Sequence, residues 1–332
     1  MDFDTHFRTG KEARVLRVQD LSVRFQTGGA SFLAVDRVSF DLERGEALGL
    51  IGESGSGKTT IALSLLRLLP AGAQLSGRVE LSGEDLLGLN PDALARIRGR
   101  RIAMVFHDPL AALNPVLSIG TQIAEAVRAH QSIDRRRART AAVGLLRTVG
   151  LPAENADRYA HQLSGGMRQR ALIAMSLACR PEILVADEPT SALDPIAQVG
   201  ILELLRGLRE ERGVSLLLAT HDLGTAARLC SRLAVLYAGR IVESGATSEL
   251  LASPRHPYTL GLLRSLPPSL GSSGPVRLEP VAGSAPPPWE RPDGCRFRNR
   301  CPRAQDDCSK REPELIEIDG RQLACFHPVE TQ

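Results

Sequence analysis

Two patterns of apolar residues divide the chain. Residues 15–25 and 34–50 contain short segments in which apolar and polar positions alternate, as they do in half-buried strands. We expect these segments to form an antiparallel sheet edge. Farther along, short apolar runs are separated by helical patterns, which predicts an α/β fold with a mostly parallel sheet covered by helices on both faces. These runs are residues 102–106, 183–186, 214–219 and 233–237.

A helix-rich stretch interrupts the alternation of strands and helices. Residues 119–130 and 135–149 carry apolar residues at spacings of three and four, which indicates helices with one buried face. We therefore expect a helical subdomain over about residues 108–166, inserted in a core that spans residues 14–266. The basic run at residues 135–139 is interpreted as a solvated helix face.

The composition changes after the core. Residues 267–294 are rich in proline and glycine, which predicts a linker because proline fits neither a helix interior nor a central strand. A small module over residues 295–330 follows and holds four of the six cysteines of the chain. The first residues, 1–13, are expected to form a loose tail.

Bulk composition narrows the class of protein. The chain has 332 residues, of which 43% are hydrophobic and 24% charged, as in globular proteins. A net charge of +3 is too small to attract nucleic acid electrostatically, so we expect no nucleic-acid partner. No uncharged apolar run reaches the roughly 18 residues of a membrane span, and the acidic start is unlike a signal peptide. We expect a protein of the reducing cytoplasmic side.

A phosphate-binding motif follows the apolar run at residues 47–51. Residues 52–59 read Gly-Glu-Ser-Gly-Ser-Gly-Lys-Thr, and a helical pattern begins directly after them. The glycines allow backbone amides to cradle phosphate oxygens at a helix N-terminus. We expect Lys58 to reach the β and γ phosphates of a nucleotide and the hydroxyl of Thr59 to bind Mg²⁺. The predicted nucleotide-binding residues of this loop are Gly52, Ser54, Gly55, Gly57, Lys58, Thr59 and Thr60.

Four further motifs occur in a characteristic order. Residues 163–170 read Leu-Ser-Gly-Gly-Met-Arg-Gln-Arg, and the apolar strand at residues 183–186 ends in Asp187 and Glu188. Pro-Thr-Ser-Ala-Leu-Asp follows at residues 189–194, and Thr-His-Asp follows a later strand at residues 220–222. Together with the phosphate-binding loop, this series resembles the ATP-binding-cassette (ABC) proteins. The resemblance implies the ABC ATPase fold, with ATP as the substrate.

The resemblance assigns roles at the nucleotide. It implies that Asp187 binds Mg²⁺, directly or through water, and that Glu188 orients or deprotonates the attacking water. His221 is the expected switch residue, with a hydrogen bond to the γ-phosphate. Phe25 stands where family members carry an aromatic residue that stacks on adenine. It also fits the strand alternation as a core residue, so both roles remain open.

The signature at residues 163–170 implies a dimer. It begins a helix, so Ser164 and the amides of Gly165 and Gly166 can grip a γ-phosphate. In ABC proteins this happens in trans, at the phosphate-binding loop of a second subunit. The resemblance therefore implies a head-to-tail pair of cassettes with ATP between them, and we expect a heterodimer.

Within the ABC proteins, the chain most resembles the ATPase subunits of oligopeptide/dipeptide importers. The matching positions are residues 108–109, 112–115, 255–259, 294–295, 300–302 and Cys308. The resemblance implies import of peptides or related small solutes, driven from the cytoplasmic face of the cell (inner) membrane. The partners would be a second ATPase subunit, two integral-membrane permeases and an extracytoplasmic solute-binding protein.

One position departs from the family pattern. The family carries a glutamine at the end of the strand at residues 102–106, where it contacts Mg²⁺ and water, and this chain has His107. His107 is thus a candidate catalytic residue whose chemistry favours slow hydrolysis. A catalytically weak regulatory cassette is the alternative to an active ATPase. A soluble ABC protein of nucleic-acid repair or translation is disfavoured, because the chain has one cassette and no long heptad stretch.

The C-terminal cysteines predict a metal site. Cys295, Cys301, Cys308 and Cys325 are spaced more widely than the paired cysteines of zinc ribbons, and four thiolates suit an iron–sulfur cluster or Zn²⁺. The resemblance implies a four-iron–four-sulfur cluster, and free cysteines are the alternative. Four interleaved arginines are expected to offset the thiolate charge: Arg296, Arg298, Arg300 and Arg303. Cys179 and Cys230 are expected to be small core residues.

Overall fold

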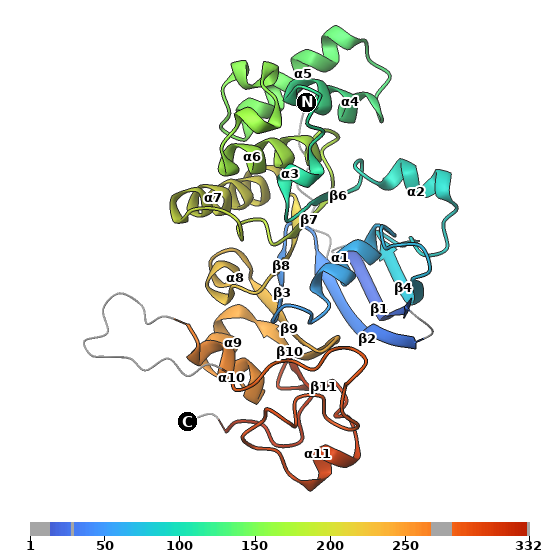
Figure 1. Cartoon of the computed structure of the whole chain (residues 1–332), viewed down its shortest axis with the longest axis vertical. Coiled ribbons are helices and arrows are strands. Elements are labelled where there is room, and N and C mark those ends of the chain that lie inside the picture. The colour runs from blue at the N-terminus through green and yellow to red at the C-terminus, as the bar shows by residue number, and fades with distance from the viewer. Residues whose placement is uncertain (1–13, 28–29, 267–280, 331–332) are drawn as a thin grey trace, which may run out of the picture.

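The computed structural model describes residues 14–27, 30–266 and 281–330 (Figure 1). The predicted N-terminal tail and the first half of the predicted linker lie outside the described residues. Among the described residues, no helix combines the length and apolar character that crossing a membrane would require.

An eight-stranded sheet forms the centre of the molecule. Its order is β11-β12-β10-β9-β3-β8-β7-β6, and the five strands from β9 to β6 are parallel to one another. The predicted apolar runs supply its middle, and their side chains are buried on both sides because both faces of the sheet are covered. The strands are β3 (Ala47–Ile51), β6 (Ile102–Val105), β7 (Ile183–Asp187), β8 (Ser215–Thr220), β9 (Arg232–Tyr237), β10 (Arg240–Ala246), β11 (Ile316–Ile318) and β12 (Arg321–Leu323).

The alternating N-terminal segments build a second sheet. β1 (Arg14–Thr27), β2 (Ala30–Glu43), β4 (Gln74–Leu81) and β5 (Glu84–Asp85) pair antiparallel in the order β2-β1-β4-β5. The expected antiparallel strands are therefore present, in a sheet of their own beside the main sheet, and residues 47–50 at the end of the predicted segments belong instead to the central strand β3. The sequence pattern did not reveal β4, because only its last few residues are buried.

Two hydrophobic cores lie on opposite faces of the main sheet. Along β8, Leu216 and Leu218 enter one core, whereas Leu217 and Ala219 enter the other, as the two-residue period of a strand requires. The second core is closed by α1 (Lys58–Leu65) and the antiparallel sheet, so helices alone do not cover both faces as predicted. The first core is closed by helices that include α7 (Pro195–Arg212), α8 (Leu223–Leu229), α9 (Thr247–Ala252) and α10 (Pro257–Arg264).

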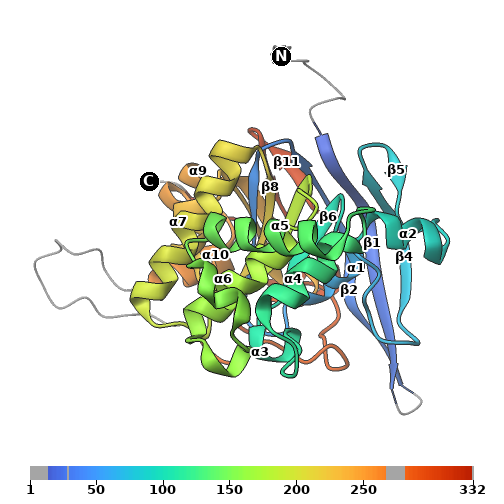
Figure 2. The same ribbon diagram turned by 90° about the horizontal axis from the view of Figure 1, so that it is seen from above.

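Helices fill the chain between β6 and β7. They lie to one side of β1, β2 and β4 (Figure 2) and are α3 (Pro109–Ala112), α4 (Ile119–Arg128), α5 (Arg135–Thr148), η1 (Ala153–Asp157), η2 (Ala160–Gln162) and α6 (Gly165–Ser176). Ser118 and Asp134 cap α4 and α5 by accepting backbone N–H bonds. The first three arginines of the basic run are exposed, Ala138 is buried, and the half-buried Arg139 pairs with Asp157. One further helix, α2 (Pro91–Ile97), lies before β6.

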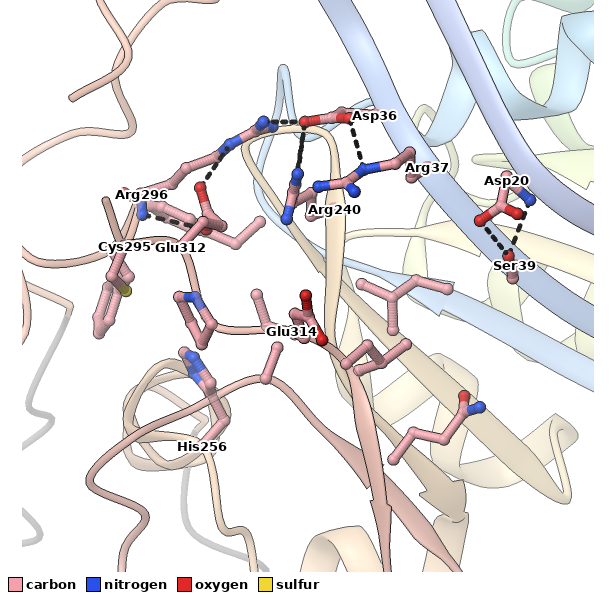
Figure 3. Close-up of a pocket in the computed structure, with 18 residues that line it drawn as sticks. Asp20, Asp36, Arg37, Ser39, Arg240, His256, Cys295, Arg296, Glu312 and Glu314 are labelled. Carbon is pink, nitrogen blue, oxygen red and sulfur yellow. Dashed lines mark hydrogen bonds and ion pairs between the residues drawn. The ribbon is translucent and has the colours of Figure 1, made fainter. Parts of the chain in front are cut away.

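The cysteine-bearing module is joined to the main sheet. β12 pairs with β10 and so extends the sheet by two strands, and α11 (Asp306–Lys310) lies at the end of the molecule away from α4 and α5 (Figure 1). Arg296 of this module donates to Asp36 of β2 and to Glu312, and Arg240 also donates to Asp36 (Figure 3). Burial would raise the pKa of Asp36, but these two guanidiniums hold it below its usual value. The module therefore packs on the core through buried ion pairs.

Candidate functional site

The phosphate-binding loop connects β3 to α1. A side chain at Gly52 would place its Cβ 2.3 Å from the carbonyl oxygen of Leu236, so only glycine fits there. Gly55 and Gly57 have φ values of 79° and 107°, which residues with side chains rarely adopt. Helix α1 begins at Lys58, directly after Gly57. The loop has the conformation that aims backbone amides at an anion.

Lys58 folds back over its own loop. Its ammonium donates to the carbonyl oxygens of Gly52 at 2.7 Å and Glu53 at 3.1 Å, and it lies 3.9 Å from the carboxylate of Glu188. The side chain is only 6% exposed, and burial lowers its pKa, which Glu188 and Asp187 partly oppose. A buried cation with weak partners is suited to receive phosphate oxygens.

A cavity of about 570 Å³ opens beside the loop. Thr59 donates to Asp187 across it at 3.0 Å, so the two predicted magnesium ligands lie together. Asp187 is 2% exposed, and burial raises its pKa, which is the behaviour of a carboxylate that needs a cation. The cavity is lined by Phe25, Phe32, Ala34, Ser54, Gly55, Gly57, Lys58, Thr59, Thr60, His107, Asp187, Glu188 and Pro288.

Glu188 and His221 contact each other. Nδ1 of His221 lies 2.9 Å from the Glu188 carboxylate, which also accepts the backbone N–H of His221 at 3.0 Å. Glu188 has a φ of 47°, a left-handed conformation that is rare for a residue with a side chain and that occurs at functional sites. The pair places a candidate base and its positioning partner at the ends of β7 and β8, beside Lys58.

His107 lies between two concave surfaces. It lines the cavity of the phosphate-binding loop, and it also lines an apolar groove of about 500 Å³. The groove is bordered by residues that follow α1, by the end of β6, and by α3 and α6, among them Leu66, Leu68, Met104, Phe106, Leu172 and Met175. Leu68 leaves 39% of its surface exposed. His107 therefore borders both the cavity of the phosphate-binding loop and the groove.

The signature residues lie elsewhere. Ser164 caps α6 by accepting the backbone N–H of Met167, and Gly165 and Gly166 follow as its first residues. A Cβ on Gly166 would be 3.0 Å from that of Ala197, so the turn packs closely on α7. Within the described part of the chain, none of these residues lines the cavity around Lys58. The predicted phosphate contacts of the signature are not made within one chain.

Sequence reasoning missed contacts that the C-terminal module makes with the loop. Arg300 binds Glu53 through two hydrogen bonds of 2.8 and 3.0 Å, and the hydroxyl of Tyr258 accepts the backbone N–H of Glu53 at 3.0 Å. Arg300 is 6% exposed and lies over the rings of Tyr237 and Phe297. Residues of α10 and of the cysteine-bearing module thus hold the phosphate-binding loop in place. The sequence around these residues contains no pattern that indicates the contacts.

The four C-terminal cysteines occupy neighbouring positions. The backbone N–H of Cys295 donates to the carbonyl of Cys308 at 2.8 Å. Burial raises the pKa of Cys295 to about 12 and that of Cys325 to about 11, and a thiolate at Cys308 would raise both further. In the described residues, the one group of three metal-ligating atoms within 4.8 Å is formed by Asp307, Cys308 and His327. Cys230 is buried as predicted, and Cys179 is half-buried.

The expectation for the interleaved arginines was wrong in part. Arg296 pairs with Asp36 and Glu312, and Arg300 pairs with Glu53, so both serve the contact with the core. Arg298 donates to backbone carbonyls. Arg303 alone among the four lowers the pKa of nearby thiols, those of Cys301 and Cys325. Sequence proximity to a cysteine did not indicate where a guanidinium lies.

Two family profiles match the chain. The ABC transporter profile matches residues 35–191, and the profile of the oligopeptide/dipeptide transporter C-terminal region matches residues 242–308. The dipeptide transport ATP-binding protein DppD of Escherichia coli is 42% identical over 320 residues, which cover 95% of this chain and 97% of DppD. A Brucella melitensis protein with a provisional name as a peptide import ATP-binding protein is 48% identical over 318 residues, which cover 95% of each chain.

Solved structures of cassettes are also similar. The ATP-binding cassette MJ0796, as a dimer in a post-hydrolysis state bound to ADP and Pi, gives a TM-score of 0.64 at 28% identity. The match covers 70% of this chain and 98% of that chain. The protein cbiO1 of Clostridium perfringens, a part of the ABC transporter complex cbiONQ, gives a TM-score of 0.63 at 26% identity, and the match covers 73% of this chain and 92% of that chain.

Proposed function

This chain belongs to the ATP-binding proteins of the oligopeptide/dipeptide ABC importer family, and we propose on that premise that it drives peptide uptake as one half of a cassette dimer. The observation that carries the dimer is the incomplete cavity. Lys58, Thr59, Asp187 and Glu188 line it, but Ser164 lies outside it. A second cassette, placed head to tail, would bring its own signature to the open side.

ATP hydrolysis at this site follows from the positions of the side chains. Lys58 and the loop amides hold the phosphates, and Glu188 accepts the proton of the attacking water while His221 holds the carboxylate in place. The hydroxyl of Thr59 and the buried carboxylate of Asp187 are hard oxygen donors that fit Mg²⁺. Bound there, the ion would neutralise charge on the phosphates.

The apolar groove is the proposed contact with a permease. The groove is open and apolar, and His107 borders both the groove and the nucleotide cavity. A movement of the permease in the groove would therefore displace His107 at the nucleotide cavity. Two permeases and a second, different cassette would complete the transporter on the cytoplasmic face of the membrane, with a solute-binding protein on the other side. Specificity for di- or oligopeptides then belongs to those partners.

Reconstitution tests this function. The chain, assembled with a partner cassette and two permeases that co-purify with it, should accumulate a labelled dipeptide in vesicles when ATP is supplied. The solute-binding protein loaded with peptide should stimulate hydrolysis. ATP hydrolysis that no peptide stimulates, in a complex that moves another solute, would contradict peptide import but keep the ATPase.

Replacing His107 with glutamine should raise the rate of ATP hydrolysis several-fold, about 1 kcal/mol in the barrier. A glutamine amide offers an oxygen to Mg²⁺, whereas imidazole offers a nitrogen on a rigid ring, a poorer match to this ion. The measurement is steady-state hydrolysis by the assembled transporter at saturating ATP and Mg²⁺.

Two outcomes at His107 separate the alternatives. A higher rate of hydrolysis supports a weak site built on this chain, as in a regulatory cassette. An unchanged rate would show that histidine serves as well as glutamine. Asp108→Asn is unsuitable as a control because Asp108 caps α3. The half-buried His130, which lines neither the cavity nor the groove, provides the matched histidine change, His130→Gln.

For the cysteine module we propose a metal cluster held by Cys295, Cys301, Cys308 and Cys325. The donor set fits, because a metal bound to these four thiols would displace their protons to solvent and balance the thiolate charge that burial disfavours. A single zinc ion needs thiolates about 4 Å apart, from Zn–S bonds of about 2.3 Å. No three of these thiols are within 4.8 Å of one another in the described residues, so the wider spacing favours a cluster over one zinc.

Anaerobically purified protein should contain iron and acid-labile sulfide, and Cys301→Ser should remove most of both with the visible absorbance. Cys179→Ser, a half-buried cysteine away from the module, is the matched control and should retain them. One equivalent of zinc without iron would overturn the cluster and point to Asp307, Cys308 and His327 as ligands. Absence of any metal would support free cysteines.

A further inference from the structure

The chain has a single tryptophan, Trp289, which contacts Phe32 in the lining of the nucleotide cavity. We propose that the C-terminal segment of residues 286–291 forms one wall of the base-binding end of this cavity, with Trp289 as its positioning residue. The inference rests on nucleotide binding at the phosphate-binding loop, and it adds a part of the site that the cassette core does not supply.

An aromatic series connects the segment to the cavity. Phe25 and Phe32 face each other across β1 and β2, with ring centroids 5.8 Å apart, and both line the cavity. The ring of Trp289 meets Phe32 edge to face at 5.7 Å. Aromatic rings prefer this arrangement, and each such contact fixes the orientation of its partner. Trp289 therefore holds Phe32, and through it Phe25, in position.

The segment is fixed to the rim of the cavity. Pro288 lines the cavity directly, next to Trp289 in the chain. Arg291 donates to the backbone carbonyls of Leu33 and Ala34, and Ala34 also lines the cavity. These contacts join residues that are more than 250 positions apart in sequence, and they keep the segment beside β2.

The residues that line the end of the cavity near Trp289 suit the nucleotide base and not a phosphate. Phosphate donors lie at Gly55, Lys58 and Thr59, whereas Phe25, Phe32 and Pro288 offer apolar surface without a cation. Planar bases bind such surfaces by stacking. Trp289 leaves 65% of its surface exposed, so its ring also has a free face near the opening. The alternative is that Trp289 only supports the β1–β2 hairpin.

Binding of ATP and of inorganic tripolyphosphate separates the two roles. Trp289→Ala should raise the Kd for ATP about five-fold, the scale of one edge-to-face contact, and leave the Kd for tripolyphosphate unchanged. Trp289→Phe should restore most of the affinity for ATP. Ile316→Ala removes an exposed apolar side chain of the cysteine-bearing module and should change neither Kd. An equal loss for both ligands, or no loss for either, would overturn the proposal.

The wild-type chain provides a second measurement that needs no variant. Because Trp289 is the only tryptophan, energy transfer from it to N-methylanthraniloyl-ATP should be strong and should disappear when ATP competes. Bound nucleotide without energy transfer would contradict this inference alone. Failure of the wild type to bind ATP, or ATP binding that survives Lys58→Ala, would instead contradict the proposed function.

Discussion

Replacing Glu188 with glutamine should lower the rate of ATP hydrolysis by at least about 100-fold, within the range attributed to a general base. The amide has the shape of the carboxylate and still accepts the backbone N–H of His221, but it cannot take a proton from water. ATP binding should persist, because Lys58 and the loop amides hold the phosphates. The measurement is single-turnover hydrolysis by the assembled transporter beside equilibrium binding of ATP.

Glu182→Gln is the matched control for Glu188. Glu182 lies directly before β7, at the end away from Glu188, where its half-buried carboxylate pairs with Arg101 and Arg44. The change removes one carboxylate beside the same strand and should leave the rate of hydrolysis within about two-fold, because Glu182 does not line the nucleotide cavity. A similar fall in rate for both variants would mean that the effect at Glu188 reflects a disturbed strand and not lost base catalysis.

The phosphate-binding side of the site could be predicted because its signals are local. Gly52 is required because a backbone carbonyl oxygen lies too close for a Cβ, and Gly55 and Gly57 are required because their φ values are positive. The motif contains all three glycines in one short loop. Asp187 and Glu188 come directly after a run of buried residues, and parallel strands bring their carboxyl ends to one edge. The same local patterns allow the parallel sheet, α1 and the closeness of Thr59 to Asp187 to be predicted. The comparisons confirm the ABC cassette fold that these motifs predicted.

The contacts from the C-terminus could not be predicted, because they depend on where distant segments pack. Nothing near Arg300 indicates Glu53 as its partner, and nothing in the pattern of residues 321–323 indicates pairing with β10. Trp289 is in a proline-rich stretch that predicts a linker, yet it contacts β2. The composition of a segment predicts how it behaves on its own. These segments pack on the surface of the core, and their composition does not indicate that contact. The roles of the individual site residues, including stacking by Phe25, stay predictions.

Replacing Ser164 with arginine should abolish ATP-driven closure of the dimer and reduce hydrolysis by at least about 100-fold, the scale of losing preorganised donors at a developing charge. Ser164 is exposed at the start of α6 and lies outside the cavity of its own chain, so the long side chain would obstruct the γ-phosphate of the partner's site. The Kd for ATP at Lys58 of the same chain should stay within about two-fold, because no contact there changes.

Ser164→Ala separates the loss of a helix cap from obstruction of the dimer. Both variants remove the hydroxyl that accepts the Met167 N–H, which costs about 1 kcal/mol of stability. Only arginine adds bulk and charge at the interface, so alanine should retain much more activity than arginine. Hydrolysis and nucleotide-dependent dimerisation are measured for each variant paired with a wild-type partner cassette. Because the signature acts on the other chain, the defect should appear at the partner's phosphate-binding loop. Normal hydrolysis by the arginine variant in the full complex would show that the signature of this chain does not complete a second site.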